Sequence, residues 1–154
     1  MAATPVRQPP GRSSAMPRRI FEAMPATEVV ILSPSATVHA AAVAMKDRHQ
    51  CVVLAMTAGR LEGILTEQDV VRRVVAERRD AERVTVAEVM TRHPDTIPAA
   101  DLALTGLQMM EDGGYRHLPV VHDGRVVGLI SRVDFAGTEK TELEAERRCW
   151  ERLG

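Results

Sequence analysis

A seven-residue string occurs twice in this chain of 154 residues. Gly-Ile-Leu-Thr-Glu-Gln-Asp fills residues 63–69, and Gly-Leu-Ile-Ser-Arg-Val-Asp fills residues 128–134. Both copies follow the pattern Gly-apolar-apolar-Ser/Thr-x-x-Asp, and they lie 65 residues apart (128 minus 63). A repeat at this spacing is typical of two copies of one supersecondary unit. The chain is therefore expected to fold as two similar halves.

Length and composition limit what those halves can be. A chain of this length suits one compact domain or two small packed halves that share a core. With 20 basic and 21 acidic residues the net charge is −1, so no global field attracts nucleic acid or an anionic membrane. No apolar run approaches the roughly 20 residues that span a bilayer. We therefore expect a cytoplasmic protein without membrane or nucleic-acid partners.

Cysteine and histidine usage gives no metal or disulfide pattern. The two cysteines, Cys51 and Cys149, are far apart and form no CxxC or Cys/His cluster. This favours a reducing compartment and argues against both a disulfide framework and a zinc site. We expect no metal and no required cofactor.

Four segments follow from composition and periodicity. Residues 1–19 are rich in proline and arginine and have no acidic residue, which predicts a disordered basic tail. A transit peptide has a similar composition, but the prolines disfavour the amphipathic helix it needs. Residues 20–84 and 85–137 form the two repeats, and residues 138–154 form a charged C-terminal helix.

The two repeats share one order of predicted elements. Short helical segments at residues 20–24 and 86–90 introduce them, followed by short strands at 29–32 and 95–97. Helical spacing comes next, and then two apolar strands joined at Ala58-Gly59 and Asp123-Gly124, which are hairpin signals. Another helical pattern follows Thr66 and Ser131. The prediction is an α/β (α+β) fold in which two β-α-β-β-α units pack sheet to sheet as a pseudo-twofold pair.

The C-terminal helix carries a narrow apolar stripe. Leu143 and Trp150 are seven residues apart, about two helical turns, so they share one side of a helix. Such a stripe either packs on its own domain or binds a second subunit.

The repeated string has a purely structural interpretation. A Ser or Thr followed three residues later by an acid is the capping box of a helix N-terminus. Thr66 with Asp69, and Ser131 with Asp134, fit this pattern. On this interpretation the string only begins a helix.

Three features favour a ligand site instead. Gly63 and Gly128 lie in strands, where glycine is costly unless another backbone or a ligand approaches closely. The junction of strand and helix offers backbone N–H groups to a phosphate. A carboxylate in the same place can accept both hydroxyls of a ribose. Hydroxyl, amides and carboxylate together suit a nucleotide.

The chain resembles a tandem pair of cystathionine-β-synthase-type (CBS) domains over about residues 20–137. The resemblance rests on both repeated strings, on the glycines Gly59 and Gly124, and on the segments Arg116-His117-Leu118-Pro119-Val120-Val121 and Val86-Ala87-Glu88-Val89-Met90-Thr91. The chain end also resembles that of a short standalone bacterial subgroup of the family.

The resemblance implies a site between the halves that holds an adenine nucleotide. Asp69 and Asp134 would bind ribose hydroxyls, and Thr66 and Ser131 would contact phosphate. The remaining positions implied by the family are the basic pair Arg116 and His117 toward phosphate, and Ile97 with the backbone of Val52 and Val53 beside the adenine.

The two copies differ in basic character. Cys51 and Val52 stand where the second copy has Arg116 and His117. Basic side chains strengthen binding of phosphate, so the second copy is predicted to be the stronger site, unless arginines from the other half reach across.

Together these features predict a non-catalytic regulatory module. It would bind AMP, ADP, ATP or a dinucleotide such as NAD, form a homodimer through its repeats, and act on an enzyme or transporter in trans. Two rivals remain. One is an enzyme, for which the sequence shows no nucleophile-base pair or metal cluster. The other is a purely structural dimerisation module with no physiological ligand.

Overall fold

The structure is a computed structural model of the chain, and it describes residues 17–153. Residues 1–16 of the predicted basic tail lie outside the described residues. Arg18 and Arg19, assigned to that tail, belong instead to the folded part. Arg19 forms a β-bridge with Leu102, and Arg18 donates two hydrogen bonds to Glu139. The predicted boundary at residue 19 is therefore too late.

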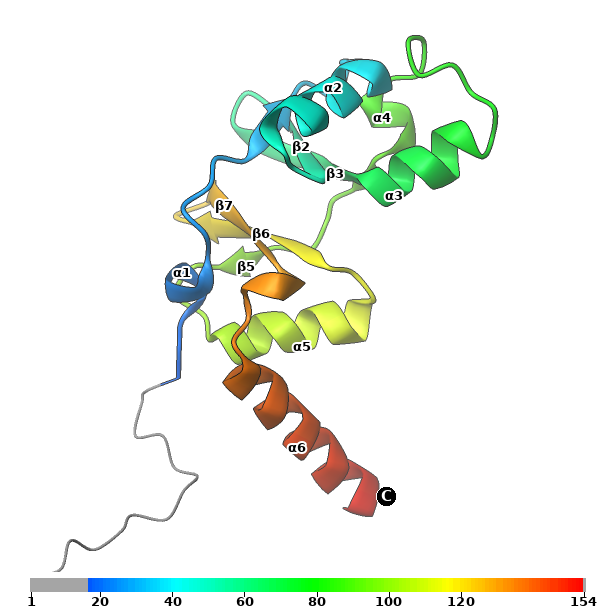
Figure 1. Cartoon of the computed structure of the whole chain (residues 1–154). Coiled ribbons are helices and arrows are strands. Elements are labelled where there is room, and N and C mark those ends of the chain that lie inside the picture. The colour runs from blue at the N-terminus through cyan, green and yellow to red at the C-terminus, as the bar shows by residue number, and fades with distance from the viewer. Residues whose placement is uncertain (1–16, 154) are drawn as a thin grey trace, which may run out of the picture.

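The elements follow one another in the predicted order (Figure 1). The first part of the chain contains α1 (Ile20–Ala23), β1 (Val30–Leu32), α2 (Val38–Arg48), β2 (Val52–Thr57), β3 (Arg60–Thr66), α3 (Glu67–Val70) and the π-helix η1 (Val71–Val75). The second contains α4 (Val86–Val89), β4 (Thr91–Arg92), β5 (Ile97–Pro98), α5 (Ala103–Gly113), β6 (His117–His122), β7 (Arg125–Ser131), the 3₁₀ turn η2 (Arg132–Asp134) and α6 (Gly137–Leu153).

Each repeat builds its own small sheet. In the first, β1 lies parallel to β2, β2 antiparallel to β3, and β3 antiparallel to the short strand β4. In the second, β5 lies parallel to β6 and β6 antiparallel to β7. The hairpin turns have positive φ at Ala58, Gly59, Asp123 and Gly124, as a two-residue hairpin loop requires. Both predicted hairpins are confirmed.

The two sheets face each other. Val52, Leu54 and Ile64 of the first sheet form a buried cluster against which Val126 and Leu129 of the second sheet pack. Helices cover the outer side of each sheet, and the two repeats lie one above the other in Figure 1. The predicted α+β fold with sheet-to-sheet packing is confirmed.

The short lead-in helices are exchanged between the repeats. Ile20 of α1 is buried in the core of the second repeat with Leu107, and its N–H donates to Asp101 O at 2.8 Å. Val86 of α4 is buried in the core of the first repeat, and its N–H donates to Ala36 O at 2.8 Å. The sequence shows only that each helix precedes a repeat, because a four-residue helix carries no signal for one core over the other.

This exchange explains the two strand glycines. A Cβ on Gly63 would lie 2.3 Å from Met90 Sδ and 2.9 Å from Thr91 O. A Cβ on Gly128 would lie 2.3 Å from Met24 Sδ. The glycines therefore admit the residues that follow α4 and α1. Within the described structure their close neighbour is the protein itself, not a ligand.

The helix α6 is packed only at its beginning. Glu139 and Leu143 are buried, whereas Trp150 and Leu153 are 74% and 75% exposed. Figure 1 shows α6 leaving α5 and continuing away from the body. The two residues of the predicted apolar stripe therefore differ, since Leu143 packs on the protein's own fold whereas Trp150 is exposed. The helix predicted directly after Ser131 is only the three-residue turn η2.

Among the described residues, no helix combines the length and the apolar character needed to cross a bilayer.

Candidate functional site

A cleft of about 560 Å³ lies between the repeats. The first repeat contributes Thr66 and Asp69, from the end of β3 and from α3. The second contributes Arg116 and His117, at the start of β6. Its volume is within the range of about 300–1,000 Å³ that is usual for small-ligand sites. The other lining residues are Cys51, Ile64, Glu67, Gln68, Thr91, His93, Pro94, Asp95, Gly114 and Tyr115.

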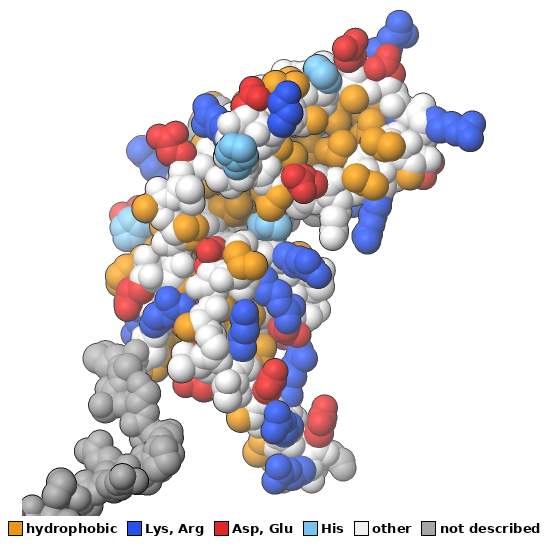
Figure 2. Space-filling view, in the orientation of Figure 1, with side chains coloured by type: hydrophobic (Ala, Val, Ile, Leu, Met, Phe, Trp, Pro, Cys, Tyr) orange, Lys and Arg blue, Asp and Glu red, His pale blue; other side chains and the backbone are white. Residues whose placement is uncertain are grey.

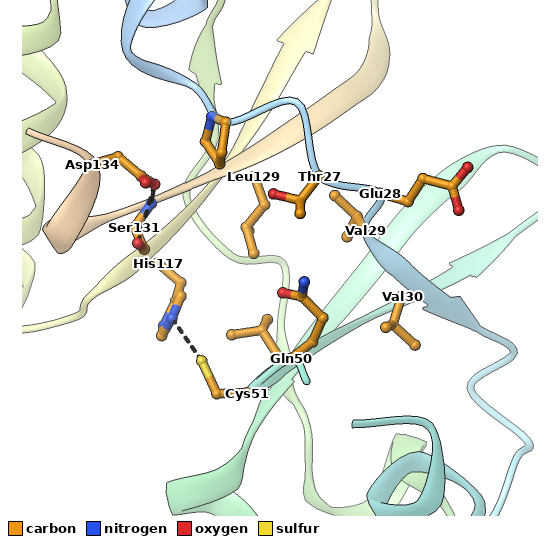
Figure 3. Close-up of a pocket in the computed structure, with 12 residues that line it drawn as sticks. Thr27, Glu28, Val29, Val30, Gln50, Cys51, His117, Leu129, Ser131 and Asp134 are labelled. Atoms are coloured by element: carbon orange, nitrogen blue, oxygen red, sulfur yellow. Dashed lines mark hydrogen bonds between the residues drawn. The ribbon is translucent and has the colours of Figure 1, made fainter. Parts of the chain in front are cut away.

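A second, smaller cleft of about 200 Å³ is the pseudo-twofold counterpart. Here Ser131 and Asp134 come from the second repeat (Figure 3). The first repeat supplies residues from the segment that leads into β1 and residues around the start of β2. These are Pro25, Thr27, Glu28, Val29, Val30, Gln50, Cys51 and Val52, and His117 and Leu129 complete the lining.

Arg116 does not join the motif of its own repeat. The sequence groups it with Ser131 and Asp134, but the structure places it on the larger cleft with Thr66 and Asp69. The next residue, His117, begins β6 and pairs with Ser131. Arg116 lies just before β6 and lines the larger cleft but not the cleft of Ser131. The basis for ranking the second copy as the stronger site is wrong.

Both repeated strings form capping boxes, as their spacing predicts. Thr66 N–H donates to Asp69 Oδ2 at 2.9 Å, and Asp69 N–H donates to Thr66 Oγ1 at 3.3 Å. Ser131 N–H donates to Asp134 Oδ2 at 2.7 Å. Within the described residues Oδ1 of each aspartate accepts no hydrogen bond, although Arg73 Nε lies 3.8 Å from Asp69 Oδ1. A cap therefore leaves one carboxylate oxygen for a ligand hydroxyl.

The hydroxyl groups of the two motifs differ. Ser131 Oγ donates to Asp134 Oδ2 at 3.1 Å, so its hydrogen is already used. Thr66 Oγ1 acts as an acceptor in its motif, which leaves its hydrogen free to donate to a ligand. On this point as well, the larger cleft is better equipped.

The backbone amides at the strand ends are largely occupied. Glu67 N–H donates to Cys51 O at 3.0 Å, and Arg132 N–H donates to Arg116 O at 2.9 Å. The expectation that these junctions offer open amides to a phosphate is therefore wrong for these two groups. Side chains must supply most of the contacts to an anion.

The side chains of two residues expected beside an adenine are buried, and for Val53 the expectation concerns its backbone. Ile97 and Val53 are fully buried, in the cores of the second and first repeats respectively. Neither lines a cleft. Val52 is also buried but borders the smaller cleft. The physical reason is that each of these strands lies inside its repeat, where the side chains of Ile97 and Val53 fill the core.

Cys51 and His117 form a wall shared by both clefts. Cys51 Sγ lies 3.4 Å from His117 Nε2, and Figure 3 shows the two side chains pointing toward each other from opposite repeats. Burial, and secondarily the Glu67 carboxylate, raises the pKa of the Cys51 thiol. Burial lowers the pKa of His117, and Arg116 lowers it further against an opposing effect of Asp134. Both groups are therefore neutral at pH 7.

Tyr115 and Asp95 were missed by the sequence reasoning. Tyr115 Oη donates to Asp95 Oδ2 at 2.8 Å on the larger cleft. Burial and this hydrogen bond raise the pKa of Tyr115 to about 12. A usable signal was that Tyr115 is the one tyrosine of the chain and directly precedes Arg116.

Among residues 17–153, no group of three His, Cys, Asp or Glu side chains is placed to hold a metal ion.

These features define a pseudo-twofold pair of β-α-β-β repeats with ligand-sized clefts between them. The family model for the CBS domain matches the chain twice, over residues 21–76 and 86–138. The chain therefore belongs to the CBS-domain family.

Relatives of two kinds match the chain. It is 33% identical over 147 residues to CBSCBSPB3 of Arabidopsis thaliana, which covers 94% of the chain. It is 32% identical over 120 residues to YhcV of Bacillus subtilis, which covers 77% of the chain and 84% of YhcV. The chain spans 26% of CBSCBSPB3 and 22% of its relative CBSCBSPB2.

Solved structures share the fold. A protein with CBS domains from Burkholderia ambifaria has a TM-score of 0.68 at 28% identity, covering 75% of this chain and 86% of that one. The CBS domain protein PAE2072 of Pyrobaculum aerophilum, solved in complex with AMP, has a TM-score of 0.74 at 23% identity, covering 83% and 99%. Standalone proteins of this family are generally regulatory modules that bind ligands.

Proposed function

We propose that this protein is a non-catalytic regulatory module that binds an adenosine-containing ligand, AMP, ADP, ATP or an NAD-type dinucleotide, in the larger cleft. The observation that carries this proposal is the juxtaposition of Thr66 and Asp69 from one repeat with Arg116 and His117 from the other, around about 560 Å³. Polar groups that converge on a cleft of this size are typical of a small-ligand site. The AMP bound to PAE2072 supports the choice of ligand class.

Each cleft group has a part in this proposal. Asp69 Oδ1 accepts the ribose hydroxyls, while Oδ2 keeps its bond to Thr66 N–H. The phosphate meets the free hydroxyl hydrogen of Thr66 and the guanidinium of Arg116, an ion with five N–H donors. Ile64 and Pro94 supply an apolar surface for the base.

The smaller cleft is the weaker candidate. Its volume of about 200 Å³ is below the usual range for a small-ligand site. No Lys or Arg lines it among the described residues, and the hydroxyl of Ser131 is already used. We assign it no more than a secondary role. This ranking reverses the one that the sequence suggests.

The regulatory step is a population shift. A ligand held by both repeats favours the arrangement of the halves that closes the cleft. A partner such as an enzyme or transporter then recognises that arrangement in trans. The free thiols Cys51 and Cys149 suit the reducing cytoplasm in which we place this action.

Homodimer formation through the repeats is part of the proposal. Figure 2 shows hydrophobic side chains gathered on the first repeat near α3 and α4. Val71 and Val75 are 57% and 65% exposed one turn apart in η1. Apolar side chains exposed together in this way favour contact with another protein surface.

Isothermal titration calorimetry with AMP, ATP and NAD tests the ligand. We expect submillimolar binding of at least one of them to the wild type. Asp69→Ala should weaken binding at least about tenfold, equivalent to about 1.4 kcal/mol. The matched control is Asp134→Ala, which removes the same cap from the smaller cleft and should change affinity less than about threefold.

The same titration decides between the sensor and the structural dimerisation module. The complete capping boxes favour the structural alternative, because they give both aspartates a role without any ligand. Asp69→Asn separates the two, since its amide oxygen still accepts Thr66 N–H but carries no charge for a ribose. Loss of binding with an unchanged melting temperature supports the sensor. Absence of binding by all three ligands, or equal losses in Asp69→Ala and Asp134→Ala, contradicts our assignment.

A further inference from the structure

The larger cleft carries more negative than positive charge. Glu67, Asp69 and Asp95 line it, and Arg116 is the one Lys or Arg among the lining residues that the structure describes. Burial lowers the pKa of His117 despite the opposing charge of Asp134, and this favours its neutral form. The fixed charge of the cleft therefore opposes a highly charged anion, apart from the contact that Arg116 provides.

Two of the three carboxylates are held in place. Asp95 Oδ2 accepts the hydroxyl of Tyr115 at 2.8 Å, and Asp69 is fixed by its capping box and only 18% exposed. Glu67 directly follows Thr66 and is exposed, and its charge contributes to the raised pKa of Cys51. Side chains fixed in this way keep their charge at the cleft when a ligand enters.

Two backbone amides at the cleft are already bonded within the protein. The amide of Glu67 is bonded to Cys51 O, and the amide of Asp69 is bonded to Thr66 Oγ1. A polyphosphate carries several negative charges, whereas Arg116 is the one lining residue with a guanidinium or ammonium group among those that the structure describes. One guanidinium balances the charge of about one phosphate group.

We propose that the larger cleft selects adenosine ligands with one phosphate or none and discriminates against ADP and ATP. The inference rests on the proposed function and narrows its ligand class. Each further phosphate adds negative charge beside Glu67 and Asp95. The second arginine nearby, Arg73, already pairs with Asp69 at 3.8 Å. The protein would then respond to the monophosphate in the presence of the triphosphate.

Calorimetric titration with adenosine, AMP, ADP and ATP, without divalent cations, tests this selectivity. AMP should bind at least about tenfold more tightly than ATP, with ADP between them. The difference in affinity between AMP and ATP should decrease when the salt concentration rises from a low value to about 0.5 M, because fixed charges are then screened. Adding Mg²⁺ to ATP should narrow it as well, since the ion neutralises part of the phosphate charge.

Charge-neutral variants assign the effect to its residues. Glu67→Gln combined with Asp95→Asn keeps the size of both side chains, and the amide oxygen introduced by Asp95→Asn can still accept the Tyr115 hydroxyl. This double variant should reduce the preference for AMP over ATP to less than about threefold. The matched control is Glu28→Gln, which removes one carboxylate from the smaller cleft and should leave the preference unchanged.

The outcomes separate this inference from the proposed function. If no adenosine compound binds, the proposed function fails and the inference fails with it. If the compounds bind but ATP equals or exceeds AMP, only the selectivity is overturned. A preference that persists unchanged in the folded double variant also overturns it, because the carboxylates would then not be its cause.

Discussion

The ion pair between Arg18 and Glu139 joins the beginning of the folded chain to the first turn of α6. Arg18 Nε and Nη2 donate to the Glu139 carboxylate at 2.7 and 3.0 Å, and Nη2 also donates to Asp134 O at 3.3 Å. The Glu139 side chain is 8% exposed and that of Arg18 is 35% exposed. Arg18→Ala would thus leave a nearly buried carboxylate without its cation.

The cost of that substitution follows from the contacts. Breaking a fully buried pair costs about 3–5 kcal/mol, whereas hydrogen bonds to charged groups contribute about 1.5–3 kcal/mol. Because Arg18 is partly exposed and water screens it, we expect a loss of about 2 kcal/mol in the free energy of unfolding. For a chain of this size that loss lowers the melting temperature by roughly 4–8 °C.

A double-mutant cycle measured by urea unfolding tests the reasoning. Arg18→Met and Glu139→Leu each break the pair, but the double variant leaves no buried charge and should lose less than the sum of the single losses. The coupling energy should exceed about 1 kcal/mol. Strictly additive single losses, or a loss below about 0.5 kcal/mol for Arg18→Ala, would refute the assignment of a stabilising buried pair.

The same pair predicts a dependence on acid. Burial by itself raises the pKa of Glu139, but the hydrogen bonds from Arg18 and Ala136 outweigh it and hold the pKa below its ordinary value of 4.5. A carboxyl group with a depressed pKa in the folded state stabilises the fold above the unfolded-state pKa and loses this contribution as pH falls through the folded-state pKa. Urea midpoints below pH 4.5 should therefore fall less in the Arg18→Met/Glu139→Leu variant than in the wild type.

Two further predictions concern packing. Gly63→Ala should destabilise the fold more than Gly128→Ala, by about 1–3 kcal/mol of overpacking. A Cβ at Gly63 would meet the rigid carbonyl of Thr91 as well as a methionine, whereas a Cβ at Gly128 would meet a flexible methionine side chain. Equal melting temperatures of the two variants would count against this reasoning. Val75→Lys should shift the protein from dimer toward monomer, as measured by light scattering after size exclusion. Lys140→Ala on α6 is the control surface change. An unchanged mass for Val75→Lys would place the dimer contact elsewhere.

Local signals predicted the elements well. Ala58-Gly59 and Asp123-Gly124 turn their hairpins with the positive φ values that the pattern requires. Thr66 with Asp69 forms the expected cap. The strands were predicted to within about a residue at most ends, whereas β4 (Thr91–Arg92) was missed because a two-residue strand has no periodicity of its own.

Long-range placement was less predictable. Arg116 lies next in sequence to the strand that carries His117, but its side chain serves the cleft of the other repeat. In α6, the sequence could not predict that Leu143 is buried and that Trp150, on the same side of the helix, is exposed. In both cases a neighbouring residue in the chain was a poor guide to the neighbour in space.

By itself the sequence determined the duplication, the order of elements and the capping geometry, because these depend on contacts within a few residues or on a period of the chain. Only the tertiary structure decided which core received Ile20 and Val86, and which cleft received Arg116. The physical reason is that two similar repeats offer nearly equivalent local choices. The packing of one sheet against the other distinguishes them, and it depends on residues far apart in the chain.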